Sequence, residues 1–345
     1  MPLSKSFKLT AVAVPLVLVG GIALAFAKPN ASRLTTEALT IRAAPIRSFS
    51  KSGDDDDRIG RLRFRGGLVL RTTHTAFGGF SGLEISPDGK QLLAVSDAGA
   101  WLKAKLQYRN GRPAGLHNAV LGPILALGNK RLQRGRDRDA EALRLLTGDL
   151  KSGIVLVGFE ANQRIGYFKL RSGRIHSPSR YLRPPVRLGR NKGIEATGVL
   201  RAGPRKGAIV AFAERTLDRN GHHRGWLWHR GKVLPLALTN VAGFDITDIA
   251  GAIDGSLYVL ERRFRWSEGV KMRIRRIAAK RLKPGAVLSG EIMMVADLGS
   301  EIDNMEGLAI HRDAKSKRTV LTVISDDNFN SFLQRTILLQ FDVLS

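Results

Sequence analysis

The sequence predicts an all-β protein, and more narrowly a single β-propeller. A unit recurs five times in the 345 residues: a carboxylate early in a short apolar segment, and a second carboxylate where the next apolar run ends. The leading acids of the five units lie 57, 54, 53 and 58 residues apart, and they are Glu84, Glu141, Glu195, Asp248 and Glu306. A near-constant period is typical of repeat architectures in which each unit packs on its neighbours. The sequence therefore favours one array over two domains.

The two ends of the chain complete one further period. Glu306 lies 39 residues before the C-terminus, and strand-like sequence begins at Arg65, 19 residues before Glu84. Together these stretches match the length of one unit, which predicts a propeller closed by strands from both termini. Closed rings of blades leave only short, protected edges. Five blades are favoured, and six remain open if one of the longer intervals hides a degenerate unit.

Local patterns inside the units predict strands and tight hairpins. Short apolar runs of strand length occupy residues 154–159, 208–212, 257–260 and 320–324. Three units contain a glycine turn flanked by polar residues, at Gly111, Gly173 and Gly231. Asn-Gly and Ser-Gly supply the positive backbone angles that two-residue hairpins require. Residues 334–344 alternate as a closing strand would.

The N-terminal residues are predicted to lie outside the propeller. Residues 1–27 combine Lys5 and Lys8 with an apolar stretch and an Ala25-Phe26-Ala27 site, the pattern of a secretory signal peptide. An uncleaved membrane anchor is the alternative, because the apolar stretch is near the length that spans a bilayer. Residues 28–60 are expected to be a polar linker, and residues 61–345 the propeller. We expect a periplasmic or secreted protein.

The composition indicates which classes of ligand the protein can bind. The formal net charge is +26 and there is no cysteine, so a bound metal must be held by oxygen or histidine ligands. A strongly basic surface attracts anions, and we expect an anionic small molecule or phosphoester as ligand. Aromatic residues make up only 6% of the chain and no nucleic-acid motif is present, so specific nucleic-acid binding is not expected. Membrane contact is expected only if the N-terminal segment is retained, and the protein is expected to be a monomer.

The recurring acids are candidates for a cation site. Carboxylate oxygens are the ligands that Ca²⁺ prefers, whereas Mg²⁺ demands a stricter octahedron and keeps more water. The first and last units become neighbours when the ring closes, and the metal ligands predicted there are Glu84, Asp97, Glu306, Asp326, Asp327 and Asn328. The acids predicted to line the channel elsewhere are Glu141, Glu160, Glu195, Glu214, Asp248 and Glu261. The alternative is that these acids accept hydrogen bonds from backbone or arginines and hold no metal.

Basic residues lie close to these acids in the sequence. The ones predicted to bind an anion are Arg138, Arg190, Lys192, Arg262 and Arg263. Guanidinium groups match phosphate oxygens bidentately. Arginines at the rim and carboxylates within would make a site for phosphate together with calcium.

Several segments resemble the phytase-like family, which is described by an esterase-like activity of phytase. They are residues 304–310 (NMEGLAI), 323–330 (VISDDNFN) and 334–343 (QRTILLQFDV), together with GGFSGLEISPDG and LLAVSDAG near the front and LERRF at 260–264. The similarity extends over residues 66–343. It implies an exported bacterial β-propeller with phosphoester hydrolase activity.

Function is narrowed to two main hypotheses. The first is a Ca²⁺-assisted phosphoester hydrolase or esterase, and the second is a non-catalytic propeller that binds an anionic ligand or an envelope partner. A sugar-lactone or other propeller enzyme is a third, more distant alternative. No G-x-S-x-G elbow and no H-E-x-x-H metal motif is present, so the sequence assigns no catalytic residue.

Overall fold

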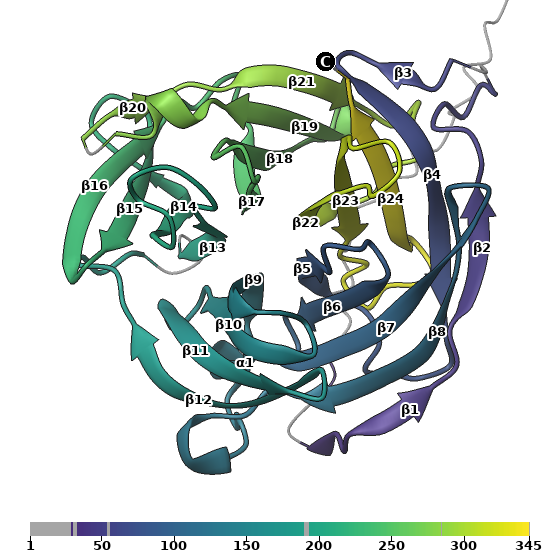
Figure 1. Cartoon of the computed structure of the whole chain (residues 1–345), viewed down its shortest axis with the longest axis horizontal. Helices are drawn as coiled ribbons and strands as arrows, with labels where there is room; N and C mark the ends of the chain where they lie inside the picture. The colour runs from purple at the N-terminus through teal and green to yellow at the C-terminus, as the bar shows by residue number, and fades with distance from the viewer. Residues whose placement is uncertain (1–28, 30–32, 54–55, 190–192, 284, 345) are drawn as a thin grey trace, which may run out of the picture.

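The molecule is a ring of five small sheets (Figure 1). The computed structural model describes residues 29, 33–53, 56–189, 193–283 and 285–344. The predicted all-β propeller is confirmed, with five blades. The predicted signal peptide at 1–27 lies outside the described residues. Within the described residues, no helix is long and apolar enough to cross a membrane.

The first two blades show the common plan, in which the chain starts at the innermost strand and works outward. Blade 1 contains β5 (Phe80–Ile85), β6 (Gln91–Ser96), β7 (Ala100–Arg109) and β8 (Arg112–Pro123), with β1 (Glu37–Leu39) at its outer edge. Blade 2 contains β9 (Ala140–Gly148), β10 (Ser152–Phe159), β11 (Arg164–Arg171) and β12 (Arg174–Leu182).

Blades 3 and 4 repeat this plan with small additions. Blade 3 contains β13 (Ile194–Val199), β14 (Ile209–Leu217), β15 (His223–His229) and β16 (Lys232–Leu238), to which β20 (Val287–Leu288) adds a short parallel pairing. Blade 4 contains β17 (Asp245–Gly251), β18 (Leu257–Arg265), β19 (Gly269–Ile277) and β21 (Glu291–Ala296).

Blade 5 closes the ring, as the sequence predicted. Its C-terminal strands are β22 (Met305–Arg312), β23 (Thr319–Ser325) and β24 (Thr336–Val343), and its N-terminal strands are β4 (Leu62–Arg71) and β2 (Arg42–Ile46). β24 and β4 pair antiparallel over their length, and β3 (Arg58–Ile59) pairs with the start of β4. Backbone hydrogen bonds thus join the two ends of the chain.

Part of the segment predicted to be a polar linker lies in the sheets. β1 pairs with β8 and β2 pairs with β4, so both are outer edge strands. Most of their side chains are exposed. An edge strand without a buried face lacks the apolar alternation that reveals a strand in sequence, which is why this pairing was not predicted.

The hairpins predicted at glycines are confirmed. Asn110 and Gly111 join β7 to β8, Ser172 and Gly173 join β11 to β12, and the β15–β16 turn follows the same pattern at 230–231. Both turn residues have positive φ in each case, 51° and 78° at the first. This is the geometry of type I′ turns, which match the strand twist.

Apolar side chains fill the spaces between adjacent blades. The described core divides into five clusters, and each one joins the sheets of two neighbouring blades. The helical segments are short: η2 (Leu127–Asn129), α1 (Gly135–Arg138) and η3 (Ala279–Arg281). The core therefore fixes the blades relative to one another, and with them the side chains that the innermost strands carry.

Candidate functional site

A β-bulge lies near the start of the innermost strand of every blade. In each blade, one residue of the innermost strand has no paired residue on the second strand, because the register shifts there. Bulges re-aim side chains and are frequent next to active sites. The residues passed over occupy five equivalent positions, here called the bulge positions, and they are Ser81, Glu141, Glu195, Thr247 and Glu306.

The second strand of each blade carries a matching residue beside the bulge. In four blades its backbone amide donates to the carbonyl two residues before the bulge position, over 2.9 to 3.2 Å. In blade 4 the corresponding residue, Arg262, pairs with Asp245. These facing positions hold Asp97, Glu160, Glu214, Arg262 and Asp326.

Seven carboxylates occupy these ten positions, and they form one electrostatically connected group. We call it the carboxylate cluster, and its members are Asp97, Glu141, Glu160, Glu195, Glu214, Glu306 and Asp326. Glu195 is at its centre, because the charges of Glu214, Glu141, Glu306 and Glu160 all act on it. Asp326 in turn feels Glu306 and Asp97. Blade 4 departs from the pattern with Thr247 and Arg262, which places one cation among the acids.

Three members of the cluster lie close enough to share one ion. Glu160, Glu195 and Glu214 each offer a carboxylate oxygen, and these atoms all lie within 4.8 Å of one another. Burial and the neighbouring carboxylates raise the pKa of Glu195 well above its usual range. Burial raises the pKa of Glu214 to about 7, although Arg215 and Arg262 act in the opposite direction. Glu195 and Glu214 therefore keep their protons to higher pH than ordinary glutamates do.

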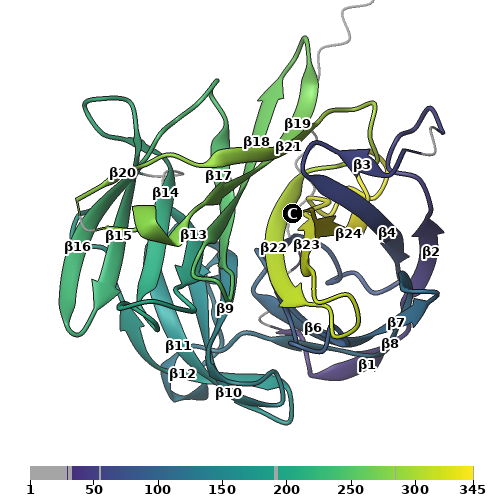
Figure 2. The ribbon, with the colours of Figure 1, turned by 45° about the horizontal axis from the view of Figure 1, so that its top comes forward.

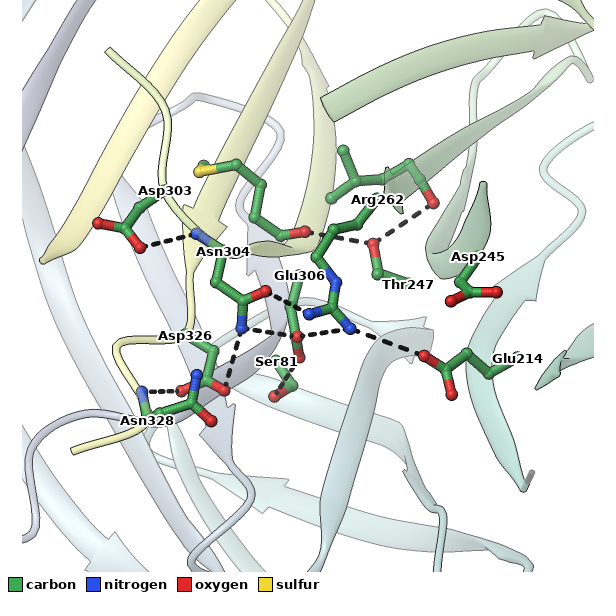
Figure 3. A network of polar contacts seen from close by, with 12 residues as sticks. Ser81, Glu214, Asp245, Thr247, Arg262, Asp303, Asn304, Glu306, Asp326 and Asn328 are labelled. Carbon is green, nitrogen blue, oxygen red and sulfur yellow. Dashed lines mark hydrogen bonds and ion pairs between the residues drawn. The ribbon is translucent and has the colours of Figure 1, made fainter. Parts of the chain in front are cut away.

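Arg262 connects the two sides of the cluster (Figure 3). Its Nη2 lies 3.6 Å from Glu214 Oε1 and 3.6 Å from Glu306 Oε1. Its Nη1 donates to Asn304 Oδ1 over 2.7 Å. Burial by itself lowers the pKa of Arg262, but Glu306, Glu195 and Glu214 raise it beyond its ordinary value. The guanidinium is thus a fixed positive charge in the site.

Asn304 and Ser81 hold the acids of blade 5 in place. Asn304 Nδ2 donates to Glu306 Oε1 over 2.9 Å and to Asp326 Oδ2 over 3.4 Å, and Ser81 Oγ donates to Glu306 Oε2 over 3.3 Å (Figure 3). Burial raises the pKa of Asp326 well above its usual range, and Glu306 and Asp97 add to this effect. Asp326 therefore keeps its proton to a higher pH than an ordinary aspartate does.

Two glycines allow the loop before β5 to approach the site. A Cβ at Gly79 would come 2.2 Å from Asp97 Oδ1 and 2.5 Å from the Phe329 ring, and its φ of +62° favours glycine. The Gly79 amide donates to Asp327 Oδ1 over 3.0 Å. A Cβ at Gly78 would also come within 2.5 Å of Asp327. The sequence GGFS thus packs blade 1 against the carboxylates of blade 5.

Comparison with known proteins gives one clear result. The model of the phytase-like family, described as esterase-like activity of phytase, matches residues 75–329. This chain belongs to the phytase-like family. The match spans all five bulge positions and all five facing positions of the phytase-like protein, so the carboxylate cluster lies within the family region. No curated protein matches the chain.

The donor set of the cluster fits calcium. Glu160, Glu195 and Glu214 of this phytase-like protein each offer a carboxylate oxygen from blades 2 and 3, and hard oxygen atoms of this kind are what Ca²⁺ takes, six to eight in number and with flexible geometry. Burial is the main cause of the raised pKa values of Glu195 and Glu214, so the protein disfavours their charged forms. A divalent cation would stabilise these charged forms.

The metal set predicted from sequence is only partly brought together. Asp97, Glu306 and Asp326 belong to the cluster. Glu84 does not: it lies three residues beyond the bulge position, where it accepts the Leu145 amide over 2.8 Å. Asp327 accepts from the Gly79 amide and from Thr336 Oγ1, and Asn328 Nδ2 donates to Gln334 Oε1. These three residues thus have hydrogen-bond partners outside the cluster, although the Asn328 backbone amide also donates to Asp326 Oδ1 over 2.6 Å.

Two of the predicted channel acids also have structural roles. Asp248 follows the bulge position by one residue, and it pairs with Arg144 at 2.5 Å while accepting the Leu308 amide. Glu261 lies opposite Ile246, so the pleat turns it into the blade, where Arg273 and Arg275 bind it at 2.7 and 2.5 Å. The four other predicted channel acids, Glu141, Glu160, Glu195 and Glu214, are members of the cluster.

Of the predicted anion-binding residues, Arg262 lies in the site. The stem of Arg138 packs on Gly99, two residues after Asp97. Arg263 instead pairs with Glu268 at 2.5 Å. Arg190 and Lys192 lie outside the described residues. Sequence reasoning missed Ser81, Thr247 and Asn304, because a hydroxyl or amide breaks the acid pattern. Aligning the units on the bulge would have found the first two.

The raised pKa of Glu214 predicts that the cluster lowers the free energy of unfolding at high pH. The pKa of the Glu214 carboxyl rises from 4.5 to about 7 on folding, so the folded state binds its proton more tightly than the unfolded state. This proton binding stabilises the fold at low pH, and the stabilisation is lost as the pH rises through 7. Glu214→Gln removes the charge that forms. Without calcium, the variant should therefore gain stability relative to wild type between pH 6 and pH 8.5, by about 1 kcal/mol or more. Thermal melts of both proteins in chelator check this, and a constant difference across that range would contradict it.

Proposed function

We propose that this phytase-like propeller is a Ca²⁺-assisted phosphoester hydrolase that acts on an anionic substrate in the periplasm or outside the cell. The observation that carries the proposal is the convergence of seven carboxylates and Arg262 at ten equivalent positions of the five blades. Family membership supports an esterase-like or phosphatase-like activity. The substrate, the cation and the location are the parts that we add.

Charge at the site supports a role for calcium. The chain is strongly basic, yet Arg262 lies between the carboxylates of Glu214 and Glu306, so a bound cation would offset the negative charge that an anionic substrate meets there. Glu160, Glu195 and Glu214 are the residues that would hold the ion. When bound, calcium polarises a phosphoryl oxygen and lowers the pKa of bound water.

The protein's own residues can position and protonate the substrate. Arg262, oriented by Asn304, donates to phosphoryl oxygens and stabilises the charge that develops on them. Glu306, held by Asn304 and Ser81, takes a proton from the attacking water as its oxygen bonds to phosphorus. Asp326, whose pKa is raised well above its usual range by burial and by Glu306 and Asp97, gives its proton to the leaving oxygen as the ester bond to phosphorus breaks. Water and ester thus become phosphate and alcohol.

The alternative of a non-catalytic propeller uses the same site. In that case the cluster would bind calcium and, through it, an anionic ligand without turnover. Family membership favours the enzyme, and we expect neither form to bind nucleic acid specifically.

Hydrolysis of a chromogenic phosphate ester tests the proposal. We expect release of the chromophore by the intact chain in calcium, loss in chelator, and recovery when calcium is restored. Glu306→Gln should reduce the rate with calcium present by about 100-fold, the usual contribution of a proton-transfer group, while Glu84→Gln should leave it unchanged. An equal rate in calcium and chelator, or no turnover at all, would refute the proposed reaction.

A further inference from the structure

A groove opens beside the carboxylate cluster, between blades 4 and 5. It has a volume of about 590 Å³ and is bordered by the β18–β19 hairpin, the residues before β22 and the β23–β24 connection. Arg262 and Asn304 form part of its lining, so the groove reaches the phosphate-binding side of the proposed site. Figure 2 shows the β18–β19 hairpin extending beyond the neighbouring strands, and Phe264, Gly269 and Val270 of this hairpin line the groove.

The walls of this groove are apolar and exposed. Phe264, Leu298 and Leu333 line it, with 55%, 50% and 73% of their surface accessible to solvent. Two further apolar side chains are close in sequence to these lining residues: Phe332 precedes Leu333, and Trp266 follows Phe264 by two residues. They are the most exposed large apolar side chains of the described residues, at 91% and 86%. Trp266 packs edge-on against Phe264, with ring centroids 5.4 Å apart. Grouped exposed apolar surface of this kind marks interaction sites.

The charges in the groove favour an anion. Lys51, Arg262 and Arg335 line it together with one carboxylate, Asp303. Lys51 Nζ also donates to the Leu298 carbonyl over 2.9 Å, and Arg335 pairs with Glu301 at 2.9 Å. Asp303 is already committed, because it accepts the backbone amides of Asn304 over 2.8 Å and of Arg335 over 3.0 Å. A ligand that fits the groove therefore combines an anionic head near Arg262 with an apolar body between Phe264 and Leu333.

We propose that the groove binds the alcohol part of the substrate, and that the substrates are phosphomonoesters of alkyl or aryl alcohols. The inference rests on the proposed function, because the phosphate is placed at Arg262 and the carboxylate cluster. It adds the substrate class: the organic group is apolar and is removed from water by Phe264, Leu298 and Leu333. A substrate that carries charge on every side would leave these walls unused.

Binding of phosphonates tests the groove without requiring turnover, because their carbon–phosphorus bond is not a phosphoester. Methylphosphonate and hexylphosphonate are titrated calorimetrically into the whole protein in calcium. Each methylene that becomes fully buried strengthens binding about fourfold, so hexylphosphonate should bind at least about tenfold more tightly even if only two methylenes are buried. Phe264→Asn with Leu333→Asn should reduce this preference to about threefold or less.

Ile253→Asn is the matched control, because Ile253 is 60% exposed and lies in the β17–β18 turn, at the opposite end of the strands from the bulges. It should keep the wild-type preference. Equal affinity for the two phosphonates, no binding of either, or an unchanged preference in the double variant would overturn the proposal. If the protein hydrolyses the chromogenic ester but does not prefer hexylphosphonate, only the role of the groove is refuted. If it prefers hexylphosphonate but does not hydrolyse the ester, the groove is a binding site and the proposed hydrolase activity is refuted.

Discussion

Replacing Glu195 and Glu214 together by glutamine is expected to abolish calcium-dependent hydrolysis. These residues supply two of the three carboxylates that lie within 4.8 Å of one another. Metal stabilisation of a phosphoryl transition state is worth several kcal/mol, and about 1.4 kcal/mol corresponds to a tenfold change in rate, so kcat/KM should fall at least about 100-fold. Steady-state kinetics at saturating calcium measures the effect.

Glu84→Gln is the control for that variant. Glu84 is also a buried acid of an innermost strand, but it accepts the Leu145 amide and lies outside the cluster. Glutamine keeps an oxygen that can accept this amide. The control should therefore retain wild-type kcat/KM. If the double variant is as active as the control, the cluster is not the catalytic site.

The second large effect concerns the stability of the ring. Arg144 of β9 is 1% exposed and donates to the carbonyls of Ile249 and Leu83 over 2.7 and 3.0 Å, while it pairs with Asp248 at 2.5 Å. It thus links blades 1, 2 and 4. Arg144→Met removes the cation and leaves Asp248 and two carbonyls without this donor, which should cost about 3 to 5 kcal/mol of unfolding free energy.

Urea denaturation gives the comparison for Arg144. Arg276→Met serves as the matched variant, because Arg276 pairs with Asp254 at 2.7 Å on the surface, where both side chains are about one third to one half exposed. An exposed pair contributes about 0 to 1 kcal/mol. If Arg144→Met costs no more than Arg276→Met, the buried pair does not hold the blades together.

The sequence carries most of the information about the fold because that information is local. Strand runs such as 154–159 and turns such as Asn110-Gly111 depend on neighbouring residues, and the period of the repeat and the closing of blade 5 follow from counting. The edge strands β1 and β2 escaped prediction, since a mostly exposed strand has no alternating pattern. Their pairing depends on residues far away in the chain.

The site could be predicted only in part, for a reason of register. A bulge adds one residue to one strand, and this shift is invisible until the pairing is known. Counting acids therefore selected Glu84 and Asp248, whereas the equivalent positions hold Ser81 and Thr247. Glu261 lies outside the cluster for a similar reason, because adjacent residues of a strand face opposite sides. Glu141, Glu195 and Glu306 do lie at bulge positions, because the acid and the bulge coincide there.

Calorimetric titration of calcium into the chelator-treated protein tests the central claim most directly. The account predicts saturable binding by wild type, with a dissociation constant between about 10⁻⁶ and 10⁻³ M. Binding should weaken as the pH falls below about 7, where protons compete for Glu214, and it should be lost in Glu195→Gln with Glu214→Gln. Calcium binding of equal strength in the variant, or no binding by wild type at pH 8, would contradict a calcium site in the carboxylate cluster.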